Sequence, residues 1–247
     1  MNFVEIENKH YILATSSFAD QRTMVLKEGD TFAIFDYHGD IHQIGSGKQG
    51  IYHHGTRHVA RMELNINGHR PMLLSSSPRQ DNQMLRIDLA NQDIASDGED
   101  IILRGTIHVL RSKFIWQSTY HEKITFINFG LDPVSFRTEI GCDADFADIF
   151  EVRGTVRPKR GEKLQTITQK DHMVFSYVGL DNVQRNTKMN FNPPPDSFRR
   201  NTAVYEINLL PRQKITVDIA MVFTQNNENR VVSGFEEARD TMNKHLD

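Results

Sequence analysis

Residues 214–223 read Lys214-Ile215-Thr216-Val217-Asp218-Ile219-Ala220-Met221-Val222-Phe223, with an apolar side chain at every second position from Ile215 onward. Alternate side chains of an extended strand point to opposite faces, so Ile215, Val217, Ile219, Met221 and Phe223 share one face. This pattern is typical of a strand in an antiparallel sheet that has one face against a core. We expect a long strand here with its apolar face in the interior.

The same two-residue period recurs toward the N-terminus, and turn residues separate the alternating runs. Asn67-Gly68 stands between the runs 62–66 and 72–74, and it suits a type I′ hairpin turn, in which both central residues need positive φ. Further turn residues cluster in His38-Gly39-Asp40, Gly130-Leu131-Asp132-Pro133 and Pro193-Pro194-Pro195-Asp196. Helical periodicity is almost absent before the last residues. The sequence therefore predicts an all-β fold over residues 1–232, a large antiparallel two-sheet β-sandwich.

The C-terminus is different. Ser233 and Glu236 have capping-box spacing, and an apolar stripe follows at helical spacing, namely Phe235, Ala238, Met242 and Leu246. We expect a C-terminal helix in residues 233–247. Two arrangements are open: the stripe packs on another domain and leaves an exposed apolar patch of several hundred Å², or the helix folds back on its own sandwich.

Composition excludes several classes of protein. A chain of 247 residues with 38% hydrophobic content can bury the core of one large domain. Its formal charge of −3 gives no footprint for nucleic acid or an anionic membrane. The lone cysteine, Cys142, excludes an internal disulfide and fits a buried thiol. With neither a signal-peptide pattern nor a membrane-length apolar run, we expect a cytoplasmic protein.

Charge is concentrated in residues 143–154, which we term the acidic segment. Its carboxylates are Asp143, Asp145, Asp148 and Glu151. Two carboxylates about 5–10 Å apart can hydrolyse a glycosidic bond, but on an extended backbone Asp148 and Glu151 point to opposite faces. We therefore predict no catalytic residue. The segment is interpreted as a loop that contacts substrate or another domain, or as a charged turn in which Asp148 or Glu151 pairs with Arg153.

Other candidate contact residues are Arg57, Arg61 and Arg153, because a planar guanidinium binds carboxylates and hydroxyls in fixed geometry. Trp116 is a further candidate, since an exposed indole can stack on a sugar; core packing is the alternative. The basic stretch 157–163 is interpreted as a solvated hairpin end.

Metal motifs are incomplete in the two places where they are suggested. His53, His54 and His58 lie close together, but no further ligand follows at zinc spacing, so we expect loop histidines. The acidic segment lacks the glycine and the distal glutamate of an EF-hand. No metal and no other cofactor is predicted.

Six stretches occur in a particular order. They are Leu26-Lys27-Glu28-Gly29-Asp30-Thr31-Phe32, Gly50-Ile51-Tyr52 with Thr56-Arg57, Leu73-Leu74-Ser75-Ser76, Arg104-Gly105-Thr106-Ile107-His108, the acidic segment, and Ser176-Tyr177-Val178-Gly179-Leu180-Asp181. In these stretches the chain resembles, over roughly its whole length, the N-terminal domain of bacterial glycogen-debranching proteins of the amylo-α-1,6-glucosidase type. One departure is that Gly55 stands before Thr56-Arg57, where the family usually has aspartate.

The resemblance implies a supersandwich-like domain that, in the family, precedes a catalytic (α/α)6 barrel. It implies that this chain is non-catalytic, packs against that barrel through a linker at residues 233–247, and lends a loop to an α-glucan site. The expected partners are the barrel and an α-glucan, with neither nucleic acid nor membrane, and an oligomer is compatible. Two alternatives stay open: a carbohydrate-binding module, and a self-contained epimerase or hydrolase that uses the acidic segment with His108 or His121.

Overall fold

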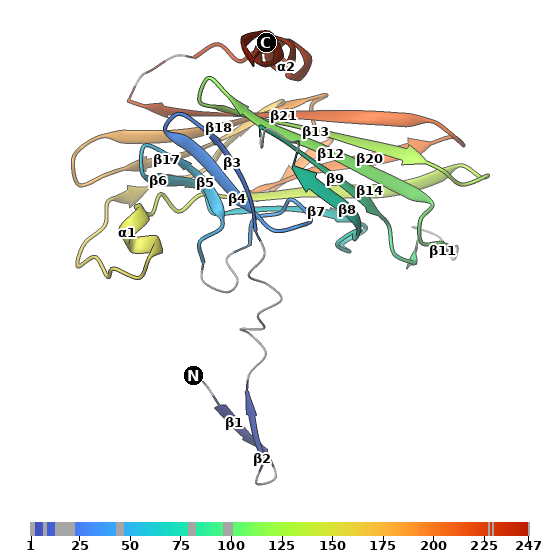
Figure 1. Cartoon of the computed structure of the whole chain (residues 1–247), viewed down its shortest axis with the longest axis horizontal. Helices are drawn as coiled ribbons and strands as arrows, with labels where there is room; N and C mark the ends of the chain where they lie inside the picture. Colours follow the sequence, from blue (N-terminus) through green and yellow to red (C-terminus); the bar gives the residue numbers. More distant parts are fainter. Residues whose placement is uncertain are drawn as a thin grey trace.

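The computed structural model describes residues 3–6, 9–12, 23–42, 47–78, 83–95, 101–226, 228 and 230–246. The described part of the chain is built mainly from antiparallel strands arranged in layers (Figure 1). Two short pairs stand apart from the main sheets: β1 (Phe3–Ile6) with β2 (Lys9–Ile12), and β10 (Ile94–Ala95) with β11 (Ile101–Ile102).

One layer is a nine-stranded antiparallel sheet with the order β15-β17-β18-β21-β13-β12-β9-β8, in which β16 also pairs with β17. Its strands are β8 (Met72–Pro78), β9 (Met84–Ala90), β12 (Ile107–Trp116), β13 (Thr119–Asn128), β15 (Glu162–Lys163), β16 (Ile167–Gln169), β17 (His172–Val178), β18 (Gln184–Asn192) and β21 (Lys214–Gln225).

The facing layer consists of two four-stranded sheets, with the orders β19-β20-β14-β7 and β3-β4-β5-β6. Their strands are β3 (Met24–Glu28), β4 (Thr31–Phe35), β5 (Gly50–His53), β6 (Thr56–Val59), β7 (Arg61–Ile66), β14 (Val134–Asp143), β19 (Ser197–Arg199) and β20 (Thr202–Leu209). One continuous hydrophobic core contains side chains from both layers, among them Phe35, Ile140 and Phe223. The predicted all-β sandwich is confirmed, with its second layer divided into two sheets.

Strand β21 follows the predicted pattern. Val217, Ile219, Met221 and Phe223 are buried, whereas Ile215, near the start of the strand, is 37% exposed. The prediction of a buried cysteine also holds: Cys142 is fully buried in β14, and burial raises the pKa of its thiol to about 12. This pKa keeps the thiol protonated and unreactive at neutral pH.

The predicted turn at Asn67-Gly68 is confirmed, but the prediction that it joins two paired strands is wrong. Both residues have positive φ, 46° and 74°, and two backbone hydrogen bonds of 2.8 and 2.9 Å join Ile66 and His69 across the turn. However, β7 pairs with β14 while β8 pairs with β9 in the other layer. The turn therefore changes layer instead of closing a two-stranded hairpin.

Helix α2 (Phe235–Leu246) folds back on its own sandwich. Phe235, Ala238 and Met242 are buried and pack with Met84 and Phe114 of the nine-stranded sheet. The Phe114 and Phe235 ring centroids are 5.0 Å apart. Most of the predicted stripe is therefore used within the chain, and the side chain of Leu246 lies outside the described part. No helix in the described residues is long and apolar enough to cross a membrane.

Candidate functional site

The acidic segment leaves β14 and turns into the short helix α1 (Ile149–Val152). Asp148 is its N-cap: the Asp148 carboxylate accepts hydrogen bonds from the backbone N–H groups of Phe150 (2.8 Å) and Glu151 (3.0 Å), and Glu151 accepts one from the Asp148 N–H (2.9 Å). This is a reciprocal capping box, which satisfies N–H groups left free at a helix start. The extended backbone considered from the sequence is wrong at this point, and the spacing Asp148-x-x-Glu151 was the signal for a helix.

Every carboxylate of the acidic segment is paired with a cation. The pairs are Asp143 with Lys163 (2.7 Å), Asp145 with Arg57 (2.5 Å), Asp148 with Arg157 (2.6 Å) and Glu151 with Arg160 (3.0 Å). Slight burial acts to raise the pKa of Asp148. The hydrogen bonds from the Glu151 N–H and from Arg157 stabilise the charged carboxylate and outweigh this effect, so the pKa of Asp148 is lowered. The expected pairing with Arg153 is wrong, because the partners come from the basic stretch 157–163 and from β6. Arg153 is instead the exposed C-cap of α1.

Arg57 is the most buried of the predicted contact residues. Its guanidinium donates to both oxygens of Asp145, at 3.1 and 2.5 Å, and also to the backbone oxygens of Gly47 and Gln49. Arg61 lies opposite Asp143 in the β7–β14 register and reaches Glu63 at 3.5 Å. The structure therefore brings both arginines to the acidic segment, where Arg57 holds Asp145 and Arg61 pairs with Glu63 of its own strand.

Replacing Arg57 by lysine is expected to lower the free energy of unfolding by about 1–3 kcal/mol, because one ammonium cannot reproduce the forked contact with Asp145 and leaves partly buried acceptors unpaired. Urea unfolding followed by circular dichroism measures this change. Arg153→Lys is the matched control, because Arg153 is exposed, and it should change stability by less than about 0.5 kcal/mol. Equal effects of the two variants would contradict the assigned role of Arg57.

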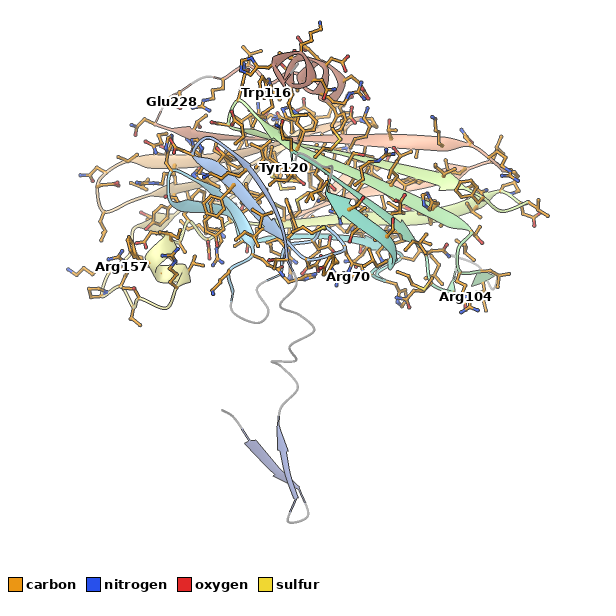
Figure 2. The ribbon with its side chains drawn as sticks, viewed as in Figure 1. Arg70, Arg104, Trp116, Tyr120, Arg157 and Glu228 are labelled. Carbon is orange, nitrogen blue, oxygen red and sulfur yellow. The ribbon has the colours of Figure 1, made fainter. Side chains whose placement is uncertain are left out.

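A groove of about 320 Å³, the α1 groove, lies beside the acidic segment. It is lined by residues that include Phe146, Arg160, Tyr177 and Asp181. The rings of Phe146 and Tyr177 stack with centroids 5.5 Å apart and 8° between their planes, and the Arg160 guanidinium lies 5.9 Å from the Tyr177 ring. Figure 2 shows Arg157, which also lines the groove, beside α1. Aromatic and charged side chains in this arrangement suit a ligand rich in hydroxyl groups or a polar protein surface.

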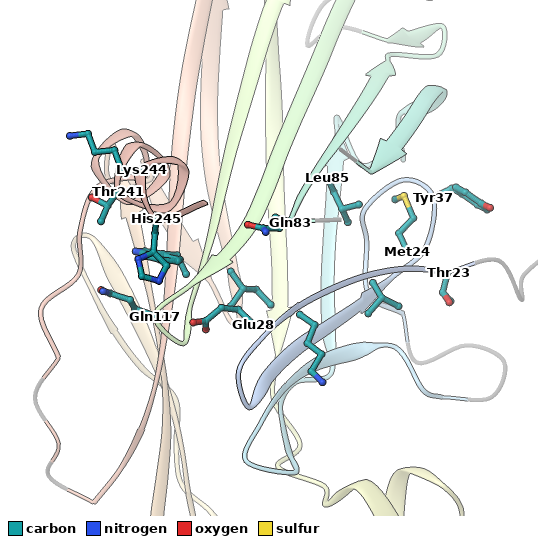
Figure 3. A pocket seen from close by; sticks show the side chains of 14 residues that line it. Thr23, Met24, Glu28, Tyr37, Gln83, Leu85, Gln117, Thr241, Lys244 and His245 are labelled. Carbon is teal, nitrogen blue, oxygen red and sulfur yellow. The ribbon is translucent and has the colours of Figure 1, made fainter. Parts of the chain in front are cut away.

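Trp116 lies in a different groove, of about 1240 Å³, between α2 and β3 (Figure 3). The lining also includes Glu28, Gln117 and His245, and the indole packs edge-on against the His245 ring with centroids 5.4 Å apart. Figure 2 shows Trp116 beside α2, whereas Arg157 lies beside α1. Trp116 and the acidic segment are therefore not parts of one site.

The histidine group is mostly part of the core. His53 in β5 and His58 in β6 are buried, and their Nδ1 atoms lie 2.8 Å from Thr31 Oγ1 and 3.0 Å from Thr187 Oγ1. Burial lowers the pKa of His53 to about 4 and that of His58 to about 3. The prediction of loop histidines is wrong for these two and right for His54, which lies in the turn between the strands. Both strands are buried at every position, so no alternation of polar and apolar residues marked these histidines as buried.

Sequence reasoning also missed a group of buried charges, which we term the core ion network: Asp40, Arg111, Lys113 and Glu122. Arg111 donates to Glu122 (2.7 Å) and Asp40 (2.5 Å), and Lys113 pairs with Glu122 (2.9 Å). All four residues are at most 1% exposed. The available signal was the position of Arg111 and Lys113 on the same alternating face as the apolar Val109 and Ile115.

Comparison with known proteins identifies the family. A model of the N-terminal domain of (some) glycogen debranching enzymes matches residues 26–220. The chain belongs to this family. The match to this glycogen-debranching N-terminal domain includes the acidic segment, the strands around it and both residues of the Phe146–Tyr177 stack. Among curated proteins, no relative matches the sequence.

Solved structures with a similar arrangement include a putative kojibiose phosphorylase from the human microbiome, with 11% identity and a TM-score of 0.48 over 77% of this chain. A putative aldose 1-epimerase from Escherichia coli K12 has 9% identity and a TM-score of 0.44 over 83% of this chain and 99% of its own. A galactose mutarotase related enzyme from Lactobacillus acidophilus has 6% identity and a TM-score of 0.42 over 85% of this chain and 100% of its own. The chain spans 25% of the length of the phosphorylase.

Proposed function

We propose that this chain is a non-catalytic β-sandwich domain of a glycogen-debranching-type α-glucosidase. It packs against a catalytic (α/α)6 barrel and presents the α1 groove to the α-glucan. Membership of the family supports this function. The observation that carries it is the pairing of all four carboxylates of the acidic segment with cations. Carboxylates held in this way position a loop, whereas a glycosidase needs one free acid and one free base or nucleophile.

The lining of the α1 groove favours the binding of glucan over a separate catalytic reaction. Tyr177 offers an aromatic ring, and the ion pair of Arg185 with Asp181 (2.8 Å) supplies donors and acceptors at the lining. Phe150, in α1, and Leu180, next to Asp181 in sequence, are 58% and 67% exposed. Exposed aromatic and aliphatic side chains next to arginines are common where a protein surface meets a partner. Because the apolar face of α2 is already covered, the barrel would dock through the α1 side of the sandwich.

Affinity electrophoresis in gels containing branched α-glucan tests the groove. We expect the purified chain to be retarded, and Tyr177→Ala to bind about 2- to 10-fold more weakly because the stacking surface is lost. Trp116→Ala is the matched control, since it removes an aromatic side chain from the other groove, and it should bind like the unmodified chain. Loss of binding in Trp116→Ala alone would move the glucan site to the groove beside α2.

A second experiment tests the accessory role. Glucose release from branched α-glucan is measured for the chain alone, for a separately produced (α/α)6 barrel, and for the two together. We expect no release by the chain alone and more release by the mixture than by the barrel. Turnover by the chain alone that Asp145→Asn or Glu151→Gln abolishes would instead support a self-contained enzyme.

A further inference from the structure

Three side chains with metal-ligating atoms meet just after β4, in a part of the molecule that the proposed function does not use. They are Asp36, Asp40 and His42, whose candidate ligand atoms all lie within 4.8 Å of one another. The site is sheltered, because the side chains of Asp36, Asp40 and His42 are 17%, 2% and 18% exposed.

In each of these three side chains, the polar atom that is not a candidate ligand makes a contact that fixes the orientation of the side chain. Asp36 Oδ1 accepts hydrogen bonds from the backbone N–H groups of His38 (2.9 Å) and Asp40 (3.0 Å), and Asp40 Oδ1 accepts one from Arg111 of the core ion network (2.5 Å). His42 Nδ1 lies 2.7 Å from Glu63 Oε1. These contacts leave Asp36 Oδ2, Asp40 Oδ2 and His42 Nε2 directed toward one another.

His42 Nε2 is the unusual atom of the group. It is buried and has no hydrogen-bond partner within the described part of the chain, although it lies 3.5 Å from Asp36 Oδ2 and 3.8 Å from Asp40 Oδ2. Because the Glu63 carboxylate can only accept, Nδ1 carries a hydrogen, and Nε2 is the ring atom left to face the two aspartate oxygens. Two carboxylate oxygens held this close together repel each other unless a positive charge lies beside them.

The spacing suits a small divalent cation. Ligands about 2.0–2.1 Å from a tetrahedral zinc ion are separated from one another by about 3.3–3.4 Å, so the observed distances of 3.5 and 3.8 Å need little adjustment. A histidine that donates its second ring N–H to a carboxylate is the common outer arrangement of metal-binding histidines. Glu63 is that carboxylate here.

Arg70 provides the positive charge when metal is absent. Its Nε lies 3.0 Å from Asp40 Oδ2, and its Nη2 contacts Asp36 Oδ2. The side chain is 36% exposed, so it can turn toward solvent when a cation takes its place. Arg70 therefore competes with a metal for the same two oxygen atoms.

We propose that Asp36, Asp40 and His42 bind a divalent first-row transition-metal ion, with Zn²⁺ as the preferred ion and Glu63 as the residue that orients His42. Mixed imidazole and carboxylate ligands favour such ions over Mg²⁺ and Ca²⁺. The bound ion links the 36–42 connection to β7 through Glu63 and to β12 through Arg111, and so stabilises the folded chain.

Calorimetric titration of the untagged, metal-free full chain with Zn²⁺ tests the site. We expect one equivalent to bind and the melting temperature to rise with Zn²⁺ but not with Mg²⁺. His42→Ala should weaken binding at least about 100-fold, and Glu63→Gln about 10- to 100-fold. His69→Ala is the matched control, because His69 is exposed in a neighbouring turn, and it should bind like the unmodified chain.

Arg70→Gln separates this site from adventitious binding to surface histidines. Removing the competing guanidinium should strengthen Zn²⁺ binding, whereas a surface site would be indifferent to it. Circular dichroism of each metal-free variant verifies that it is folded. The proposal is overturned if Zn²⁺ does not bind stoichiometrically, if His42→Ala binds like the unmodified chain, or if Arg70→Gln binds no more tightly.

Discussion

Replacing Glu122 by glutamine is expected to lower the free energy of unfolding by about 3–5 kcal/mol. Glu122 is fully buried, accepts hydrogen bonds from Arg111 (2.7 Å) and Tyr120 (2.6 Å), and pairs with Lys113 (2.9 Å). The amide removes one of the two negative charges that face two buried cations. Loss of one partner of a buried ion pair is costly because the remaining charge stays out of water without compensation.

Urea unfolding, followed by circular dichroism and by fluorescence of Trp116, measures this loss. Glu206→Gln is the matched control, because Glu206 forms an ion pair of 2.8 Å with Arg137 in which the two side chains are 48% and 33% exposed. Exposed pairs typically contribute no more than about 1 kcal/mol. A loss below about 1 kcal/mol for Glu122→Gln would show that the core ion network is not a main support of the fold.

Acidification is expected to destabilise the chain steeply below pH 6.5. His53, His58 and His121 are buried, and burial lowers their pKa values to about 4, 3 and 4. Their pKa in the unfolded chain is about 6.5, so the unfolded chain binds more protons below that pH. Stability from this source is complete above pH 6.5 and is lost as the pH falls, by up to about 1.4 kcal/mol per pH unit for each histidine.

The three histidines together account for up to about 8 kcal/mol between pH 6.5 and 4.5, which is comparable with the whole stability of a typical domain. Stability measured in urea at several pH values gives the slope. His121→Phe should reduce that slope by about a third, because the ring keeps its stacking on Phe114, 4.9 Å away, but no longer titrates. His69→Gln, at an exposed position, should leave the slope unchanged. An unaltered slope in His121→Phe would contradict the neutral, buried state of His121.

The parts of the fold that depend on local pattern were predictable from the sequence. The alternation of β21 and the positive φ of Asn67 and Gly68 follow from neighbouring residues, and the structure has both. The choice of partner strand depends on contacts between distant segments. For this reason the Asn67-Gly68 turn was predicted, whereas the change of layer that follows it was not.

The candidate site was predictable to a similar extent. The carboxylates of the acidic segment and Arg57 were identified, because a high density of charged residues can be recognised in the sequence itself. The basic stretch 157–163 was interpreted as a separate solvated end, although it supplies Arg157, Arg160 and Lys163 to those carboxylates. The core ion network was missed because alternation alone cannot show that a charged side chain on an apolar face has a partner.

The four charged residues of the core ion network come from both layers of the sandwich, and this makes the layers depend on each other. The β12–β13 hairpin supplies Arg111, Lys113 and Glu122, which leaves one positive charge in excess, and Asp40 comes from a segment 71 residues before Arg111. The inner face of the hairpin is electrically balanced only once the connection after β4 lies against it. The nine-stranded sheet and its covering layer are therefore electrostatically coupled, since Asp40, which follows β4 of the covering layer, compensates the excess positive charge of the hairpin.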